Sequence, residues 1–279
     1  MPPMSQSILD GGNAPPVLRE DLRGDSGIVA VLTLNRPEQR NTLSEATLAA
    51  LGETLGAIAR DDRVKAVVLA ANGSAFCAGH DLKELTGRRG DGDGGRAYYT
   101  RIMGTCSALM QQVVRLPQPV VAAVQGMATA AGCQLVASCD LAVASSAAKF
   151  CTPGVDIGLF CSTPMVALSR NVARKHAMEM LLTGEPVTAE HAARIGLVNR
   201  AVAPGTERDE ALRLARTVAS KPAMTVRLGK AAFYRQLELG LADAYLLASQ
   251  VMVENMLRED AAEGIGAFLD KRAPRWPDR

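Results

Sequence analysis

The chain has 279 residues, enough for one large domain or for a domain with an appendage. Hydrophobic residues make up 48% and charged residues 22%, and the formal net charge of +2 gives no indication of nucleic acid or a membrane surface as the main partner. No apolar run reaches the roughly 18 residues that span a bilayer. Residues 1–24 are predicted to be a disordered tail and lack the pattern of a secretory signal.

The cysteines lie in apolar segments, with neither CxxC spacing nor clustered histidines around them. This pattern favours buried free thiols in a reducing compartment over disulfides or a zinc site. We therefore expect a cytoplasmic protein that holds no metal and no other resident cofactor. The residues concerned are Cys77, Cys106, Cys133, Cys139, Cys151 and Cys161.

The first half of the chain alternates between strand and helix patterns. Runs rich in Val and Leu predict strands, and apolar residues at helical spacing predict helices. The alternation indicates an α/β core with parallel crossovers. The expected strands are 27–35, 65–71, 119–125 and 139–145, and the expected helices are 45–60, 102–116 and a short one after Gly126.

From about residue 165 the pattern becomes helical. We expect a layered core over residues 25–200 and a C-terminal helical region over 201–279. A Gly-rich charged segment at 88–96 is too polar to pack and is expected to form a mobile surface loop. The helices expected in the second half are 163–182, 188–194, 207–219, 222–237, 240–257 and 260–270.

Two turns of small residues follow strands, at 78–80 and 130–132. Each turn can offer a backbone N–H group, and two converging N–H donors form an oxyanion hole that stabilises negative charge on a carbonyl oxygen. Such turns are common in α/β proteins, so their spacing alone does not distinguish an oxyanion hole from two purely structural turns. The chain has no G-x-S-x-G motif, no phosphate loop and no dinucleotide-binding fingerprint.

Four segments of the chain resemble the signature segments of the crotonase, or enoyl-CoA hydratase/isomerase, family. The resemblance extends in register from about residue 27 to residue 276. It implies a spiral of repeated β-β-α units with a C-terminal helical region that forms homotrimers, often paired as hexamers. The segments are LTLNRPEQRNTLS (32–44), SAFCAGHDLKEL (74–85), PVVAAVQGMATAAGCQLVASCDLAVAS (119–145) and EGIGAFLDKRAPRW (263–276).

The resemblance also implies an acyl-CoA thioester as the substrate, with its carbonyl oxygen held between the backbone N–H groups of His80 and Ala131. Arg40, Thr42 and Lys83 would meet the adenine and phosphates of the coenzyme. Phe268 and Lys271 would come from the C-terminal helix of a neighbouring subunit. The complete binding set implied is Arg40, Thr42, Ala78, His80, Asp81, Leu82, Lys83, Ala131, Phe268 and Lys271.

The sequence departs from the family at the two glutamates with which its hydratases activate water. Gln134 and Gly154 stand at these positions, and neither side chain can accept a proton from water at neutral pH. Asp156, placed on the same side by an extended segment, or the imidazole of His80 could serve instead as the base. For Asp156 the alternative is a helix N-cap, and for His80 a structural loop histidine.

Three functions therefore remain open. The first is an enoyl-CoA hydratase/isomerase of fatty-acid metabolism. The second is a protein with the same fold that binds acyl-CoA or a protein partner without turnover. The third is an isomerase or thioesterase that uses Asp156 or His80 as its base.

Overall fold

The structure, a computed structural model, describes residues 14–277, and within this range the strands form two sheets. The larger sheet has the strand order β1-β2-β3-β5-β7-β10. Every neighbouring pair in it is parallel except β1 and β2. Its strands are β1 (Val17–Gly24), β2 (Gly27–Leu34), β3 (Val64–Ala71), β5 (Val120–Val124), β7 (Leu141–Ser145) and β10 (Arg200–Val202).

A smaller sheet has the strand order β4-β6-β8-β9. Successive strands alternate between the two sheets, since β3 is followed by β4, β5 by β6 and β7 by β8, and a helix or helical turn follows each pair. This is the expected spiral of β-β-α units. The strands are β4 (Ala75–Cys77), β6 (Met127–Thr129), β8 (Lys149–Cys151) and β9 (Val187–Thr188).

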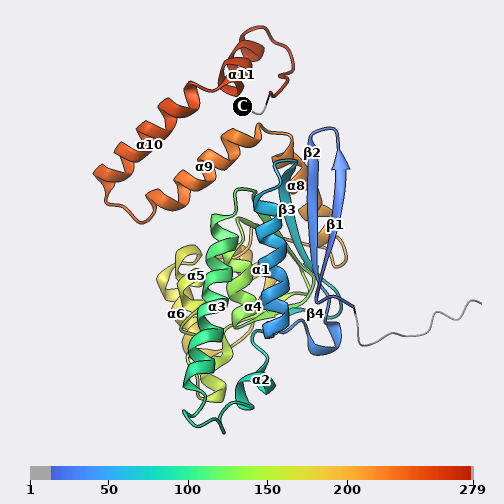
Figure 1. Cartoon of the computed structure of the whole chain (residues 1–279), viewed down its shortest axis with the longest axis vertical. Helices are drawn as coiled ribbons and strands as arrows, with labels where there is room; N and C mark the ends of the chain where they lie inside the picture. The colour runs from blue at the N-terminus through green and yellow to red at the C-terminus, as the bar shows by residue number, and fades with distance from the viewer. Residues whose placement is uncertain (1–13, 278–279) are drawn as a thin grey trace, which may run out of the picture.

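The central strands of the larger sheet are buried on both faces, which explains why β2, β3, β5 and β7 are mostly apolar. Along β2, Ile28, Ala30 and Leu32 face the main core. The alternate residues Val29 and Val31 face a second core formed with helix α8 (Glu207–Ala219). In Figure 1, α1 (Glu45–Ala59) and α3 (Arg96–Arg115) cover one face of the sheet and α8 lies against the other.

Helix α8 therefore belongs to the layered core, so the predicted boundary near residue 200 lies too early. The helices that leave the core are α9 (Ala223–Gln236), α10 (Leu241–Met256) and α11 (Glu259–Leu269). We call these three helices the arm. Figure 1 shows the arm projecting beyond the end of the sheet, with α9 and α10 side by side.

A buried polar cluster fixes the arm to the core. Lys230 of α9 reaches the Asp140 carboxylate with an Nζ–Oδ2 distance of 2.6 Å, and Tyr234 donates a hydrogen bond of 2.9 Å to Oδ1. The Val120 N–H donates to the same carboxylate at 2.7 Å. Burial lowers the pKa of Lys230, while the adjacent Asp140 charge acts in the opposite direction. The cluster is thus a compact, largely desolvated anchor at the start of β5 and β7.

Several expectations need correction. Residues 17–24 form β1, so the predicted disordered tail of residues 1–24 is too long, and residues 1–13 lie outside the described range. The expected helix 163–182 is two helices, α5 (Pro164–Asn171) and α6 (Arg174–Thr183), because the chain at Val172 adopts an extended conformation. The segment 88–96 consists mostly of exposed turns, and its mobility stays a prediction.

Two other features of the described chain bear on function. All the cysteines are buried free thiols, as the sequence predicts. No helix within residues 14–277 is long and apolar enough to cross a membrane. The remaining helices are α2 (Leu82–Thr86), α4 (Ala131–Ser138) and α7 (Ala189–Arg194), with 3₁₀ turns η1 (Pro37–Gln39) and η2 (Pro153–Ile157).

Candidate active site

The two small-residue turns predicted from the sequence meet in space. Gly79, which follows β4, has a φ of +84°. A Cβ atom at this position would lie 3.1 Å from the Ala130 Cβ and 3.3 Å from the Ala131 nitrogen. Glycine is therefore required twice, for its left-handed backbone and for the close approach of the second turn. This contact joins segments that are about 50 residues apart in the sequence.

The first turn is held by the loop that precedes α1. The Ala78 N–H donates to the Arg40 carbonyl at 3.0 Å, and the Leu43 N–H donates to the Gly79 carbonyl at 2.8 Å. Asn41, which is 1% exposed, shapes this loop with its side chain. Its Nδ2 group donates to the carbonyls of Asn72 and Ala75 at 2.8 and 2.9 Å. Asn41 was not predicted as a site residue, although asparagine suits its φ of +53°.

The second turn is strained and closely packed. Ala130 has φ = +51° and ψ = −118°, an unusual conformation for a residue with a Cβ atom. Its N–H donates to the Cys151 carbonyl at 2.9 Å, and α4 begins at the next residue, Ala131. A Cβ atom on Gly132 would lie 2.2 Å from the Cys77 carbonyl oxygen. Helix α4 can therefore rest directly on β4 because position 132 has no side chain.

Two backbone N–H groups at these turns lack an acceptor among the described residues: those of His80 and Ala131. The Ala131 N–H is the first of α4, where the positive end of the helix dipole also favours negative charge. The turns thus bring together the pair of donors that an oxyanion hole requires.

The His80 side chain lies beside this pair and is half-buried. Both ring nitrogens are inaccessible to solvent and make no hydrogen bond of good geometry within residues 14–277, although the Leu43 backbone lies close enough to interact with the ring. Burial lowers the pKa of the imidazole. His80 is therefore neutral near pH 7, with one nitrogen that donates and one that accepts.

Gln134 and Gly154 occupy buried positions near the second turn. Gln134 is 5% exposed, and its Oε1 atom has no hydrogen-bond partner in the described chain. A Cβ atom on Gly154 would lie 3.0 Å from the Cys161 Sγ atom and 3.0 Å from the Leu159 carbonyl oxygen. A larger side chain at position 154 thus requires the 159–161 segment to move.

Asp156 does not lie in the extended segment that the sequence suggested. It belongs to the 3₁₀ turn η2 and is exposed, and it lies inside this turn, so the N-cap alternative is also wrong. Its Oδ2 atom lies 2.9 Å from the position that a Cβ atom on Gly184 would take. The carboxylate therefore packs beside the residue that ends α6.

The residues expected to bind the coenzyme divide into two groups. Thr42 and Asp81 meet through a long hydrogen bond of 3.4 Å, and Asp81 caps α2 by accepting from the Lys83 N–H at 2.8 Å. Arg40, Leu82 and Lys83 are exposed, and Ala78 is half-buried. Phe268, at 82% exposure, and Lys271 lie on and after α11, which Figure 1 shows far from α2.

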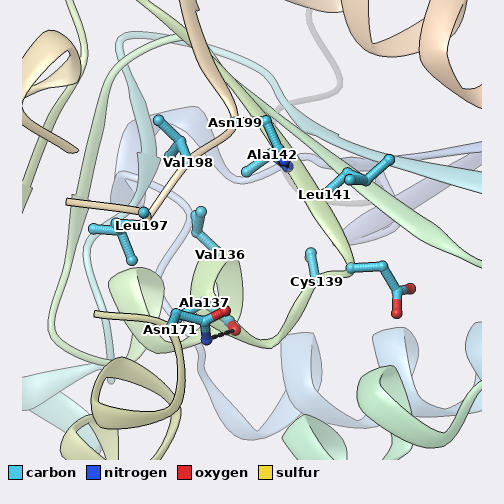
Figure 2. A pocket seen from close by; sticks show the side chains of 11 residues that line it. Val136, Ala137, Cys139, Leu141, Ala142, Asn171, Leu197, Val198 and Asn199 are labelled. Carbon is cyan, nitrogen blue, oxygen red and sulfur yellow. Dashed lines mark hydrogen bonds between the residues drawn. The ribbon is translucent and has the colours of Figure 1, made fainter. Parts of the chain in front are cut away.

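A separate hollow lies at the other end of α4, as Figure 2 shows. Val136 and Ala137 form one side of it, and Leu197 and Val198 the other. The side chains of its asparagines form hydrogen bonds with the backbone. Asn171 donates to the Ala137 carbonyl at 2.8 Å, and Asn199 accepts from the Ala142 N–H at 2.7 Å. This hollow is distinct from the two turns. Among the described residues, no group of three or more His, Cys, Asp or Glu side chains could hold a metal ion.

Comparison with known proteins identifies the family of the chain. The model of the enoyl-CoA hydratase/isomerase family matches residues 24–279. The chain belongs to the enoyl-CoA hydratase/isomerase family. A rat relative, enoyl-CoA hydratase domain-containing protein 3, mitochondrial, is 47% identical over 98% of this chain and 91% of its own length. The human relative of that name is 48% identical over 88% of this chain and 79% of its own length.

Solved structures of family members share the fold. A crystal structure of an enoyl-CoA hydratase from Mycobacterium smegmatis superposes with a TM-score of 0.88 at 52% identity, covering 94% of this chain and 99% of that one. Human enoyl-CoA hydratase domain-containing protein 3 gives a TM-score of 0.87 at 47% identity, covering 94% of this chain and all of that one. The predicted family and fold are thereby confirmed.

The relatives correct the expected location. The rat, mouse and human proteins that are 45–48% identical to this chain are all named mitochondrial. The prediction of a cytoplasmic protein is therefore wrong. It relied on reduced cysteines and on an N-terminal segment without a secretory pattern, and neither observation distinguishes the cytosol from another reducing compartment.

Proposed function

We propose that the protein binds acyl-CoA thioesters and polarises the thioester carbonyl between the N–H groups of His80 and Ala131. The contact of Gly79 with the Ala130–Ala131 turn carries this proposal, because it brings two otherwise unpaired donors to one place. The acyl-CoA chemistry comes from the family, since relatives such as the Clostridium acetobutylicum protein are named short-chain-enoyl-CoA hydratase. We assign the protein to fatty-acid metabolism on the same basis.

The coenzyme would lie along the Thr42–Asp81 contact, with Arg40 and Lys83 facing its phosphates. Both cations are exposed, so they can turn toward an anionic ligand at little cost. Phe268 and Lys271 are too remote to join them within one chain, and we assign them to a neighbouring subunit's site. The exposed apolar residues of the arm support a homotrimer or a hexamer.

Hydration is expected to be slow. A positioned acid or base typically accelerates a reaction ~10²–10⁴-fold, and neither Gln134 nor Gly154 can fill that role. Asp156 is exposed and packs beside Gly184, so it is poorly placed to replace them. His80 is neutral and half-buried, with both ring nitrogens shielded from solvent, which suits a weak base in a double-bond isomerisation or thioester hydrolysis.

A second candidate is binding without turnover. The specific observation in its favour is that the donors of the oxyanion hole are backbone groups, which remain whatever side chains stand at positions 134 and 154. Such a protein would hold an acyl-CoA or present it to a partner.

The first experiment follows the enoyl absorbance of crotonyl-CoA and, in parallel, the binding of butyryl-CoA by calorimetry. Infrared difference spectra of bound butyryl-CoA report polarisation directly, because an oxyanion hole lowers the stretching frequency of the thioester carbonyl. Binding with a lowered frequency and no turnover would select the non-hydratase alternatives. Failure to bind any CoA thioester would disprove the common premise.

The variant Gly79→Ala tests the oxyanion hole. It places a methyl group against the Ala130–Ala131 turn, so the frequency shift should be lost and butyryl-CoA binding should weaken about tenfold or more. Gly205→Ala is the matched control, because Gly205 has a φ of +85° but no neighbour within 4 Å of an added Cβ. The proposal fails if the two variants affect the carbonyl frequency equally.

The variant Gln134→Glu tests whether a missing carboxylate limits hydration. It returns a proton acceptor to α4 without a change of size, and we expect turnover of crotonyl-CoA to rise by about tenfold or more. An unchanged rate would show that position 134 does not face the reacting carbons.

A further inference from the structure

The chain reverses its direction just after α11, at a residue with an unusual backbone conformation. Lys271 has a φ of +56°. Its N–H donates to the Phe268 carbonyl at 3.2 Å, and the Arg272 N–H donates to the Ala267 carbonyl at 3.0 Å. These two hydrogen bonds form a Schellman motif, in which glycine usually occupies the left-handed position. Lysine therefore holds a conformation that its Cβ atom disfavours.

Positive φ values outside glycine are concentrated at the proposed acyl-CoA site. Within residues 14–277 they occur at four residues. Arg40 and Asn41 form the loop that holds the first turn, and Ala130 lies in the second turn. The fourth is Lys271, which we assign to the site of a neighbouring subunit. Such strain persists only where the surrounding structure enforces it, and it is typical of functional sites.

The contacts that enforce the reversal come from residues 270–277, which we call the tail. The Glu263 carboxylate of α11 accepts two hydrogen bonds from the Arg272 guanidinium, at 2.7 and 2.8 Å, and one from the Arg275 N–H at 2.7 Å. Arg272 is the main reason why the pKa of Glu263 is lowered to about 2. The carboxylate is thus charged at neutral pH and fastens the tail to the helix that precedes it.

Trp276 joins the tail to the base of the arm. Its Nε1–H group donates to the Ser220 carbonyl at 3.0 Å, and Ser220 lies between α8 and α9. The half-buried indole also rests on α11, since a Cβ atom on Gly264 would lie 3.1 and 3.2 Å from two of its ring carbons. The indole is therefore wedged between α11 and the start of the arm, which lie near each other in Figure 1.

These contacts do not contribute to the apolar cores. Neither core includes a described residue beyond residue 219. The tail instead fixes the last turn of α11, which carries Phe268, and the reversal that carries Lys271. An indole suits this task because it is rigid and combines a large apolar surface with one hydrogen-bond donor.

We propose that Trp276 is a positioning residue, which acts through the reversal at Lys271 to orient Phe268 and Lys271 toward the coenzyme bound by a neighbouring subunit. This inference rests on the proposed acyl-CoA binding. Trp276 acts through the backbone and does not contact the ligand. The nucleotide half of the ligand, and not its acyl chain, should therefore respond to changes in the tail.

The test compares butyryl-CoA with S-butyrylpantetheine, the same thioester without the nucleotide, by calorimetry on the full chain. Trp276→Ala should weaken butyryl-CoA binding about tenfold, as expected for the loss of a charge-assisted contact, and leave S-butyrylpantetheine binding unchanged.

Gly264→Ala should have the same effect, because its methyl group displaces the indole. Alanine also favours the helix, so melting of α11 would not explain the loss. Trp276 is the only tryptophan of the chain, and its fluorescence should shift to longer wavelength in Gly264→Ala as the indole becomes exposed.

The matched control is Gly229→Ala, which also adds a methyl group inside an arm helix but has nothing within 4 Å of the added atom. It should leave both dissociation constants and the emission unchanged. If Trp276→Ala does not fold, Gly264→Ala decides alone.

Four results would overturn the inference: equal weakening of the two thioesters, unchanged butyryl-CoA binding, unshifted emission in Gly264→Ala, or dissociation of the subunits by light scattering. Dissociation would mean that the tail serves assembly. If the unmodified protein binds neither thioester, the proposed function itself fails, which is a distinguishable result.

Discussion

The core around the two turns and the C-terminal arm are built in opposite ways. Every residue of α4 is buried, and this helix packs so closely on β4 that Gly132 has no space for a methyl group. In α10, by contrast, none of the 16 residues is buried. Leu241, Leu257 and Phe268 of the arm are at least 76% exposed. The core buries its apolar side chains within one chain, whereas the arm has an apolar surface that one chain alone does not cover.

The two regions also differ in how they are held. Packed apolar side chains hold the core, and at the two turns the backbone segments approach without room for a side chain, so the geometry there tolerates little change. The arm is fixed through the Lys230–Asp140 cluster and through two ion pairs at the surface, Arg227 with Asp62 and Arg170 with Glu238. Substitutions in the core should therefore disturb the site, and substitutions at the anchor should release the arm while the site survives.

The largest effect is expected from Lys230→Met. Removal of one partner from a buried ion pair leaves an uncompensated carboxylate and costs ~3–5 kcal/mol. The expected result is rapid hydrogen exchange throughout α9–α11, with β3 and β5 still protected. The matched control is Arg170→Met, which breaks an ion pair whose side chains are 55% and 64% exposed and should change little. Equal exchange in the two variants would contradict the anchor.

A smaller loss of stability is expected from Gly132→Ala. The added methyl group would lie 2.2 Å from the Cys77 carbonyl oxygen, so α4 must move away from β4 at a cost of about 2–3 kcal/mol. Gly229→Ala in α9 is the counterpart in the arm, where nothing lies within 4 Å and the change should stabilise the helix by ~0.5–1 kcal/mol. Denaturant unfolding measures the stability of both variants. If Gly132→Ala and Gly229→Ala change stability in the same direction, the proposed difference between core and arm is refuted.

Ala130→Gly should increase the free energy of unfolding by about 1 kcal/mol, because it relieves backbone strain. Ala130 holds φ = +51° and ψ = −118°, a conformation that glycine adopts readily. The same exchange in regular helix, Ala137→Gly, should destabilise the protein. A destabilised Ala130→Gly variant would mean that the Ala130 methyl group contributes more by packing than it costs in strain.

The smallest effect concerns pH and His80. Burial lowers the pKa of His80 in the folded state, so between this value and the ordinary value of about 6.5 the unfolded chain binds more protons. Stability should therefore fall as the pH decreases below about 6.5. Between pH 7.5 and 5.5 the melting temperature should decrease less in His80→Gln than in the unmodified protein. The control is His176→Gln on α6. Parallel curves for all three would refute the prediction.

Periodicity predicted most elements well, because burial of one helix face or of a whole strand leaves a clear pattern. The helices at 207–219, 222–237 and 240–257 match the observed α8, α9 and α10 to within one residue. The short strands β4 and β6 were missed, since three residues are too few to show any period. The strand β1 was missed because it is mostly exposed on the sheet edge, with few apolar residues.

The site shows the same limit. Small residues at 78–80 and 130–132 suggested two N–H donors, but only the packing of Gly79 on Ala130 shows that the turns meet. The helical turn around Asp156 could not be read from a segment of mixed composition. The Asp140–Lys230 pair joins residues 90 positions apart, and no local sequence pattern predicts such a contact.

The positions of the cysteines have a practical consequence. All of them lie between residues 77 and 161, hence in the core and none in the arm. Burial raises the pKa of Cys77 to about 12 and also raises that of Cys133, so neither reacts with an alkylating reagent until the surrounding core opens. The rate of alkylation of Cys77 and Cys133 therefore reports opening of the core, whereas Cys139, which lies beside the Asp140–Lys230 pair, should also respond to release of the arm.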